Sequence, residues 1–349
     1  MKLFLPLPRA GVQARGTSHI DALAPGLDLL VISQEVAGLG CPVLADWETT
    51  LTLSWAKSDE ACVKVFFFGL GYCAQALIRR APEIEASGTT RSEERADALR
   101  RMGVEAFVFD GDRVEPGLDA ALGQAEAIVV SIPPHGDDWA SRFASAIGAA
   151  PALKSVVYYS TIGVYGDHGG AWVDETSETR TRSARGLARL ADERRWSEAG
   201  RELGVATDVL RLPGIYGPGR NALVKLRARQ ARRIVKPGHV ASRAHVDDIA
   251  EMTRLVLSSA LEGQVWNVGD DAPSPPEDVV AYAASLMGVD APPEEPFDGA
   301  KLSPMAASFY ADEKRVSNAK AKRLLGFQPA YPSYREGLRA LWEEEAGRS

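Results

Sequence analysis

The stretch VKVFFFGLGYCAQALIRRA, residues 63–81, decides the fold. The unbroken apolar run after Lys64 is typical of a strand that is buried on both faces. The segment 72–81 repeats apolar residues at helical spacing, with Ala74, Leu77 and Ile78 on one face. We therefore expect a strand, a glycine turn and a helix, the first half of a βαβ unit.

The turn between these two elements has the pattern Gly-x-Gly-x-x-Ala, and its residues are Gly69, Leu70, Gly71, Tyr72, Cys73 and Ala74. The first glycine permits a tight turn, and the second lets backbone N–H groups approach a pyrophosphate. The pattern by itself is weak, but its place between a buried strand and an amphipathic helix supports it. We expect these six residues to bind a dinucleotide, and a glycine turn without a ligand is the alternative.

The same alternation of apolar runs and amphipathic segments continues along the chain. Ser92 is expected to begin a helix that ends near Gly103. Further strands are expected within 83–91, 104–112, 125–134 and 154–166. Repeated βα units of this length predict an α/β protein, with a Rossmann-type doubly wound parallel sheet covered by helices on both faces.

The end of the second strand distinguishes the two nicotinamide cofactors. A carboxylate there binds the ribose 2′-hydroxyl of NAD, whereas a cation accommodates the 2′-phosphate of NADP. This chain has Thr90, Arg91 and Ser92, so we expect NADP to be preferred, with NAD possible. The alternative is that Arg91 is a surface arginine, since Glu93 and Glu94 follow it. Other strand ends add expected cofactor contacts at Asp110, Gly111, Ser131, Ile132, Pro133 and Pro213. Asp110 could accept from the adenine amine, and capping of the turn is its alternative role.

Composition narrows the class of protein. The net charge of −7 over 349 residues is dispersed, and no basic stripe suggests a nucleic-acid partner. The three cysteines lack metal-ligand spacing, so we expect no metal site and a reducing compartment. No stretch suggests a membrane span or a secretory signal, and we expect a cytoplasmic protein. Residues 1–62 are expected to form a poorly ordered extension.

From Val63 almost to the C-terminus, the chain resembles the short-chain dehydrogenase/reductases, in particular the extended branch of NAD-dependent epimerase/dehydratases. The motifs that carry the resemblance are GLGYCA (69–74), YYSTIGVYGDHGG (158–170), VLRLPGIYGPGR (209–220), RAHVDDIA (243–250), VWNVGDD (265–271) and RLLGFQPAYPSYREGLRAL (323–341). The resemblance implies a Rossmann domain over 63–214 that is completed by about 243–269. It also implies a smaller substrate-binding lobe built from 215–242 and 270–349.

The resemblance fails at the family's catalytic Tyr-x-x-x-Lys pair. Alignment on LADE (190–193) places Arg185 on the tyrosine position and Arg189 on the lysine position. Arginine stays protonated, so Arg185 cannot transfer the proton, whereas Arg189 could still donate to the nicotinamide ribose. Thr161 lies where the family has a serine or threonine, and it would orient a carbonyl.

Another group would then move the proton. The candidates are His168 with Asp167, Tyr165 and Tyr216, because all lie near strand ends where ligands bind in such sheets. Histidine is the side chain whose unperturbed pKa lies nearest to physiological pH, which suits this role. A structural hydrogen bond is its alternative role, and Tyr165 is commonly a packing residue in the resembling enzymes.

Two functions remain open at this point. One is an NAD(P)-dependent oxidoreductase or epimerase acting on a sugar-like or nucleotide-sugar substrate. The other is a catalytically degenerate NADP-binding sensor or scaffold. A nucleotide-sugar diphosphate would suit Arg211, Arg220, Lys225 and Arg243, although these residues could equally form salt bridges. The family's dimer bundle would involve the helices around Ala140 and Arg189, so a homodimer is possible.

Overall fold

The structure is a computed structural model, and it describes residues 62–111, 114–134, 139–298, 302 and 304–347. The expected N-terminal extension, 1–62, lies outside the described residues except for Cys62. The described residues from Cys62 onward belong to one compact unit.

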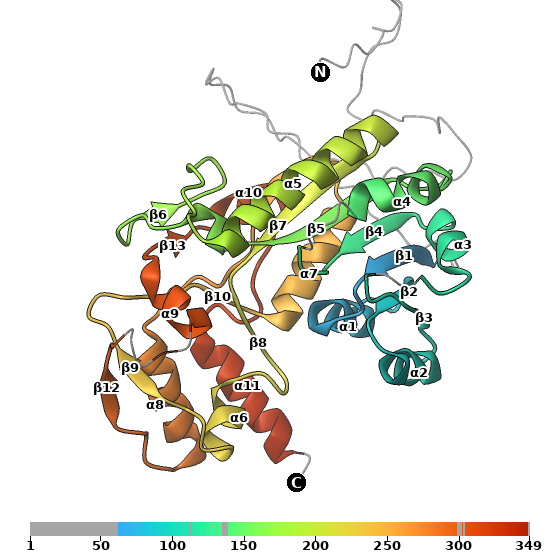
Figure 1. Cartoon of the computed structure of the whole chain (residues 1–349). Coiled ribbons are helices and arrows are strands. Elements are labelled where there is room, and N and C mark those ends of the chain that lie inside the picture. Colours follow the sequence, from blue (N-terminus) through green and yellow to red (C-terminus); the bar gives the residue numbers. More distant parts are fainter. Residues whose placement is uncertain (1–61, 112–113, 135–138, 299–301, 303, 348–349) are drawn as a thin grey trace, which may run out of the picture. The chain divides into compact units, whose positions relative to one another are not determined.

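A seven-stranded parallel sheet forms the centre of this unit (Figure 1). Its strand order is β11-β7-β5-β4-β1-β2-β3, and every neighbouring pair is parallel. The order reverses between β1 and β4, which is where ligands bind in doubly wound sheets. The predicted Rossmann-type fold is therefore confirmed. The strands are β1 (Val63–Phe68), β2 (Ile84–Thr90), β3 (Glu105–Val108), β4 (Ala127–Val130), β5 (Ser155–Thr161), β7 (Ala206–Leu212) and β11 (Val265–Asn267).

Helices cover both faces of the sheet, as the alternation of side chains along β1 requires. Val65 and Phe67 face one core, against α1 (Tyr72–Arg80), α2 (Glu93–Arg101), α7 (Val246–Leu257) and α10 (Ala319–Leu325). Phe66 and Phe68 face the other core, against α3 (Leu118–Gly123), α4 (Trp139–Gly148) and α5 (Ala184–Leu203). Phe327, just after α10, also packs in the first core, so part of the segment expected in the smaller lobe supports the sheet.

The smaller lobe has a core of its own, formed by three helices. They are α6 (Ala222–Arg227), α8 (Pro276–Met287) and α11 (Tyr334–Ala346). Short parallel pairs join β10 (Arg243–His245) to β8 (Gly214–Tyr216), and β12 (Glu294–Pro296) to β9 (Arg233–Val235). The helix α9 (Pro304–Ala311) leads into β13 (Arg315–Val316). β13 pairs with β6 (Trp172–Val173), beside the short helix η1 (Ile162–Tyr165).

Charges on the smaller lobe are mostly compensated. The basic stretch near α6 pairs with glutamates, in the ion pairs Arg227–Glu345, Arg232–Glu295 and Arg233–Glu294. Within the described ranges, no helix combines the length and the apolar character needed to cross a bilayer.

Candidate cofactor and active site

The glycine turn after β1 is held by hydrogen bonds from two neighbouring strands. The N–H of Gly69 donates to Thr89 Oγ1 at 2.9 Å, and Ser131 Oγ donates to the carbonyl of Gly69 at 2.6 Å. Gly69 has a φ of +97°, and a Cβ there would lie 2.8 Å from Ser131 Oγ. Only glycine fits this position. Ser131, which we expected to contact the cofactor, binds the turn with its side chain.

Gly71 differs from Gly69, because space is open beside it. A Cβ on Gly71 would meet no heavy atom of the described residues within 4 Å. Gly71 is also the N-cap of α1, no side chain caps this helix, and its first turn has no acidic residue. Cys73 and Ala74 are buried below, against the sheet. Free N–H groups beside an open space are what the diphosphate of a dinucleotide requires, so these residues fit the expected cofactor.

A turn of the smaller lobe lies against the start of α1. Tyr72 Oη donates to the carbonyl of Pro218 at 3.0 Å, and the guanidinium of Arg220 lies 5.8 Å from the centre of the Tyr72 ring. Burial raises the pKa of Tyr72 to about 12 and that of Cys73 to about 11, so both are neutral. Cys73 is therefore a buried thiol that packs in the core.

The residues expected to select between NAD and NADP lie at the end of β2. Thr90 is buried, whereas Arg91 and Ser92 are exposed. Ser92 is the N-cap of α2, although its hydroxyl accepts no N–H of that helix. No carboxylate of the described residues pairs with Arg91, and the neighbouring Glu93 binds Arg100. The guanidinium of Arg91 is thus available to a ligand.

The other expected cofactor contacts lie at further strand ends. Asp110 is exposed after β3, and Gly111 follows with a φ of +116° and a carbonyl that accepts from Arg142. Pro133 is exposed after β4, and Pro213 is buried between β7 and β8.

Arg189 on α5 reaches the carboxyl ends of two central strands. Its Nη1 donates to Ile132 O at 3.2 Å, to Tyr158 Oη at 3.0 Å and to Tyr159 O at 3.0 Å. Its Nε and Nη2 have no partner among the described residues. Arg185, one helical turn earlier, is exposed and has no carboxylate partner there either.

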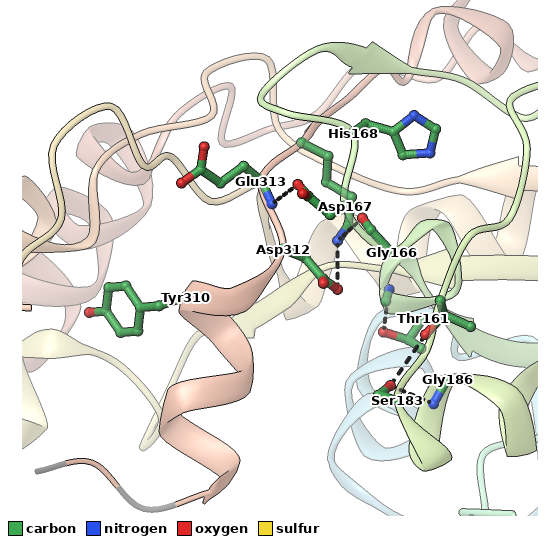
Figure 2. A network of polar contacts seen from close by, with 12 residues as sticks. Thr161, Gly166, Asp167, His168, Ser183, Gly186, Tyr310, Asp312 and Glu313 are labelled. Carbon is green, nitrogen blue, oxygen red and sulfur yellow. Dashed lines mark hydrogen bonds and ion pairs between the residues drawn. The ribbon is translucent and has the colours of Figure 1, made fainter. Parts of the chain in front are cut away.

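Thr161 ends β5 beside the start of α5. Its Oγ1 accepts the N–H of Gly163 at 3.1 Å, so its own hydroxyl hydrogen can be donated elsewhere. The helix α5 packs against η1, which begins directly after Thr161. Figure 2 labels Ser183 and Gly186 at the start of α5. Ser183 caps α5 by accepting the N–H of Gly186 at 3.0 Å.

His168 is held in the turn after η1, but not by Asp167. Its Nε2 is 3.1 Å from the carbonyl of Glu178, and its backbone N–H donates to Glu313 O at 3.0 Å. Asp167 instead accepts the N–H groups of Gly169 at 3.0 Å and Glu313 at 2.9 Å (Figure 2). The expected His–Asp pair is therefore wrong. A neutral His168 donates from Nε2 to the Glu178 carbonyl, which leaves Nδ1 as its basic nitrogen.

The two tyrosine candidates, Tyr165 and Tyr216, are both buried. Tyr165 is fully buried, its hydroxyl donates to Asn267 Oδ1 at 2.8 Å, and the guanidinium of Arg211 lies 4.9 Å from its ring centre. Tyr216 is also buried, and its hydroxyl faces Ser333 O at 3.4 Å. Burial raises the pKa of both hydroxyls. Their geometry supports packing rather than proton transfer.

Comparison with known proteins agrees with this architecture. Residues 140–269 match the model of the NAD dependent epimerase/dehydratase family. This part of the chain, from α4 to β11, is similar to that family. It is 28% identical over 291 residues to Protein YeeZ of Escherichia coli K12, covering 77% of this chain and 96% of that protein.

Two solved structures have a similar fold. A functionally unknown conserved protein from Silicibacter pomeroyi DSS is 42% identical, with a TM-score of 0.73 over 81% of this chain and 99% of that chain. UDP-glucuronic acid 4-epimerase from Bacillus cereus, solved with UDP-glucuronic acid and NAD, is 17% identical. Its TM-score is 0.63 over 82% of this chain and 100% of that chain, which shows a shared fold.

The four cations expected to bind a substrate diphosphate, Arg211, Arg220, Lys225 and Arg243, do not come together at one site. Arg211 is buried in an ion pair with Glu193, at 3.2 and 2.8 Å. Arg243 donates to two backbone carbonyls, Ala241 O at 2.9 Å and Ser274 O at 3.0 Å. Arg220 lies at α1, and Lys225 is exposed. Glu193 lies within the LADE motif, but nothing in the sequence around it indicates that it pairs with Arg211.

Two carboxylates have environments that the sequence did not reveal. Asp270 is 3% exposed, and burial raises its pKa to about 7 against the opposing charge of Arg243. Asp248 lies in the first turn of α7, and it accepts the N–H groups of Ala330 at 2.7 Å and Tyr331 at 3.3 Å. The cap of α7 is His245, whose Nδ1 accepts from Asp247 N. Within the described residues, no group of three metal-binding side chains comes together.

Proposed function

We propose that this chain binds a nicotinamide dinucleotide and is an oxidoreductase or epimerase acting on a sugar-like or nucleotide-sugar substrate. The observation that carries the proposal is the open space at Gly71, beside the uncapped N-terminus of α1. The family match over residues 140–269, which lies outside the glycine turn, supports a dinucleotide-binding protein. The nucleotide-sugar part is supported by neighbours of the same fold, one of which was solved with UDP-glucuronic acid and NAD.

NADP preference is the finer part of the proposal, and it rests on Arg91. Arg91 is exposed at the end of β2, and no carboxylate of the described residues neutralises it. A guanidinium can bind the 2′-phosphate with paired hydrogen bonds. Replacement Arg91→Ala should therefore weaken NADPH binding about 10-fold or more and leave NADH binding nearly unchanged. Equal effects on both cofactors would leave Arg91 without this role.

The chain's own residues then have distinct roles at the reaction centre. The bound dinucleotide would supply hydride transfer. Thr161 would donate its hydroxyl to a substrate carbonyl, because its oxygen already accepts from Gly163. Arg189, anchored through Nη1, would present Nε and Nη2 to the nicotinamide ribose. Arg185 would orient the substrate without moving a proton, and Nδ1 of His168 is the proton carrier that remains.

The second candidate is a cofactor-binding protein with little or no turnover, a sensor or scaffold. Arg185 and Arg189 favour it, because neither can exchange a proton at physiological pH. The intact smaller lobe favours an enzyme, because a sensor needs no substrate-binding surface. We therefore give the enzyme precedence.

The cofactor proposal is tested by titrating the purified chain with NADPH and NADH and following nicotinamide fluorescence. Gly71→Ala should abolish binding and leave the melting temperature nearly unchanged, because its methyl group enters only open space. Gly69→Ala is the matched control, which should destabilise the fold through Ser131 and its φ of +97°. Normal binding by Gly71→Ala would refute the placement of the cofactor.

Turnover separates the two candidate functions. A panel of nucleotide-sugars is incubated with the loaded protein, and product and nicotinamide absorbance are measured. Conversion of any member supports the enzyme, whereas tight NADPH binding without conversion across the panel supports the sensor. We also propose a cytoplasmic homodimer that uses the outer surfaces of α4 and α5, and light scattering of the purified chain tests its mass.

A further inference from the structure

We propose that Arg220, on the turn between β8 and α6, binds the diphosphate of the dinucleotide together with the glycine turn. The smaller lobe would then supply a charge to the cofactor as well as a surface to the substrate. This inference rests on the cofactor binding proposed above.

The position of Arg220 is set by contacts at the first residue of α1. Its guanidinium carbon lies 5.8 Å from the ring centre of Tyr72, and Tyr72 Oη donates to Pro218 O at 3.0 Å. Tyr72 directly follows Gly71, where space for a ligand is open. Arg220 and the free N–H groups of α1 therefore border the same region.

The turn that carries Arg220 is tightly packed. Gly217 and Arg220 exchange two backbone hydrogen bonds of 3.0 Å. A Cβ on Gly217 would lie 2.6 Å from Tyr72 Oη and 2.8 Å from Val246 Cγ1. The backbone of this turn therefore packs closely against α1 and α7. This packing fixes the position of the Arg220 backbone relative to the start of α1.

The charge of Arg220 is not neutralised by a carboxylate of the described residues. Arg220 is exposed, and no carboxylate of the described residues pairs with it, whereas Arg227, Arg232 and Arg233 of the same lobe each bind a glutamate. Its positive charge opposes the rise that burial causes in the pKa of Cys73, the second residue of α1. The charge of Arg220 adds to the positive partial charge at the N-terminus of α1. A diphosphate could accept hydrogen bonds from both the helix N–H groups and the guanidinium.

Arg220 is less suited to bind the diphosphate of a substrate than that of the cofactor. Arg211 is neutralised by Glu193, and Arg243 is engaged by backbone carbonyls, so neither joins Arg220 at one anion site. The remaining explanation is a surface cation–π contact with Tyr72 that has no ligand role. Binding measurements distinguish it from the proposal.

The experiment compares Arg220→Ala with Arg101→Ala, which removes the same charge from the exposed last turn of α2. Calorimetry with NADH and with ADP-ribose gives the affinities, since ADP-ribose keeps the diphosphate and lacks the nicotinamide. Arg220→Ala should weaken both ligands about 10-fold to 100-fold, and Arg101→Ala should not. The salt dependence of binding should also become shallower in Arg220→Ala. Arg220→Lys, which keeps the charge without the planar fork, should recover part of the loss.

Two results would overturn the inference in different ways. If Arg220→Ala binds both ligands as tightly as the wild type does, the cofactor site stands but Arg220 has no part in it. A wild-type chain that binds neither ligand removes the cofactor proposal as well. The melting temperature of Arg220→Ala should match the wild type, because the side chain is exposed.

Discussion

Replacement of Asp270 by asparagine is expected to make the protein more stable at neutral and alkaline pH. Asp270 follows β11 and is 3% exposed, and its carboxylate oxygens accept no well-formed hydrogen bond from the described residues. The opposing charge of Arg243 and the nearby N–H groups of Arg243 and Ala272 offset only part of the cost of burial. Its pKa is therefore raised from 3.8 to about 7.

The raised pKa fixes both the sign and the size of the effect. Between these two values the folded chain keeps the proton that the unfolded chain has lost, so the free energy of unfolding falls as pH rises. A shift of this size corresponds to about 4 kcal/mol as an upper limit. Asparagine is neutral at every pH and avoids the penalty. We expect Asp270→Asn to be more stable than the wild type by about 2–4 kcal/mol at about pH 8, and by much less at about pH 5.

Urea unfolding at the two pH values measures this difference. Asp290→Asn is the control, because Asp290 is exposed and the same substitution there should leave stability unchanged within about 0.5 kcal/mol. An Asp270→Asn variant that gains no stability at pH 8 relative to pH 5 would show that the carboxylate is compensated in solution. The reasoning from burial would then be wrong.

Three further substitutions test the site and its support. Glu193→Gln should cost about 3–5 kcal/mol in urea unfolding, since it leaves Arg211 buried without its counter-charge, and a loss below about 1 kcal/mol would contradict the buried pair. Tyr165→Phe should cost about 1 kcal/mol through the lost hydrogen bond to Asn267 and leave any pH–rate profile unchanged, whereas a shifted profile would make Tyr165 the proton carrier. Arg189→Ala should lower NADH affinity about 10-fold in fluorescence titration, with Arg189→Lys recovering part of it, and unchanged affinity would remove Arg189 from the cofactor site.

The fold and the glycine turn could be predicted because their determinants are local. The run Phe66–Phe68 alternates between two apolar cores, and the adjacent turn needs a glycine at Gly69 for its positive φ. Both features are visible in consecutive residues, since strand burial and turn conformation depend on short stretches of chain.

The partners of the candidate site residues could not be predicted, because they depend on contacts between distant segments. Asp167 is adjacent to His168 in the sequence, yet it binds the backbone of Glu313, which is 146 residues away. The pairing of Arg211 with Glu193 likewise depends on how α5 lies on β7. The sequence shows which residues are charged. It does not show which distant residue each of them binds when the chain is folded.

The chain returns at β13 to contact the turn at 166–170. Lys314 Nζ donates to Gly166 O at 2.9 Å, and the strand pair of Arg315–Val316 with Trp172–Val173 closes beside it. An exchange of smaller lobes between relatives would therefore have to carry 312–327 along with the acceptor turn at 166–170. A chimera with a junction between these two segments would separate the turn that carries His168 from the backbone of 312–327 that holds it in place.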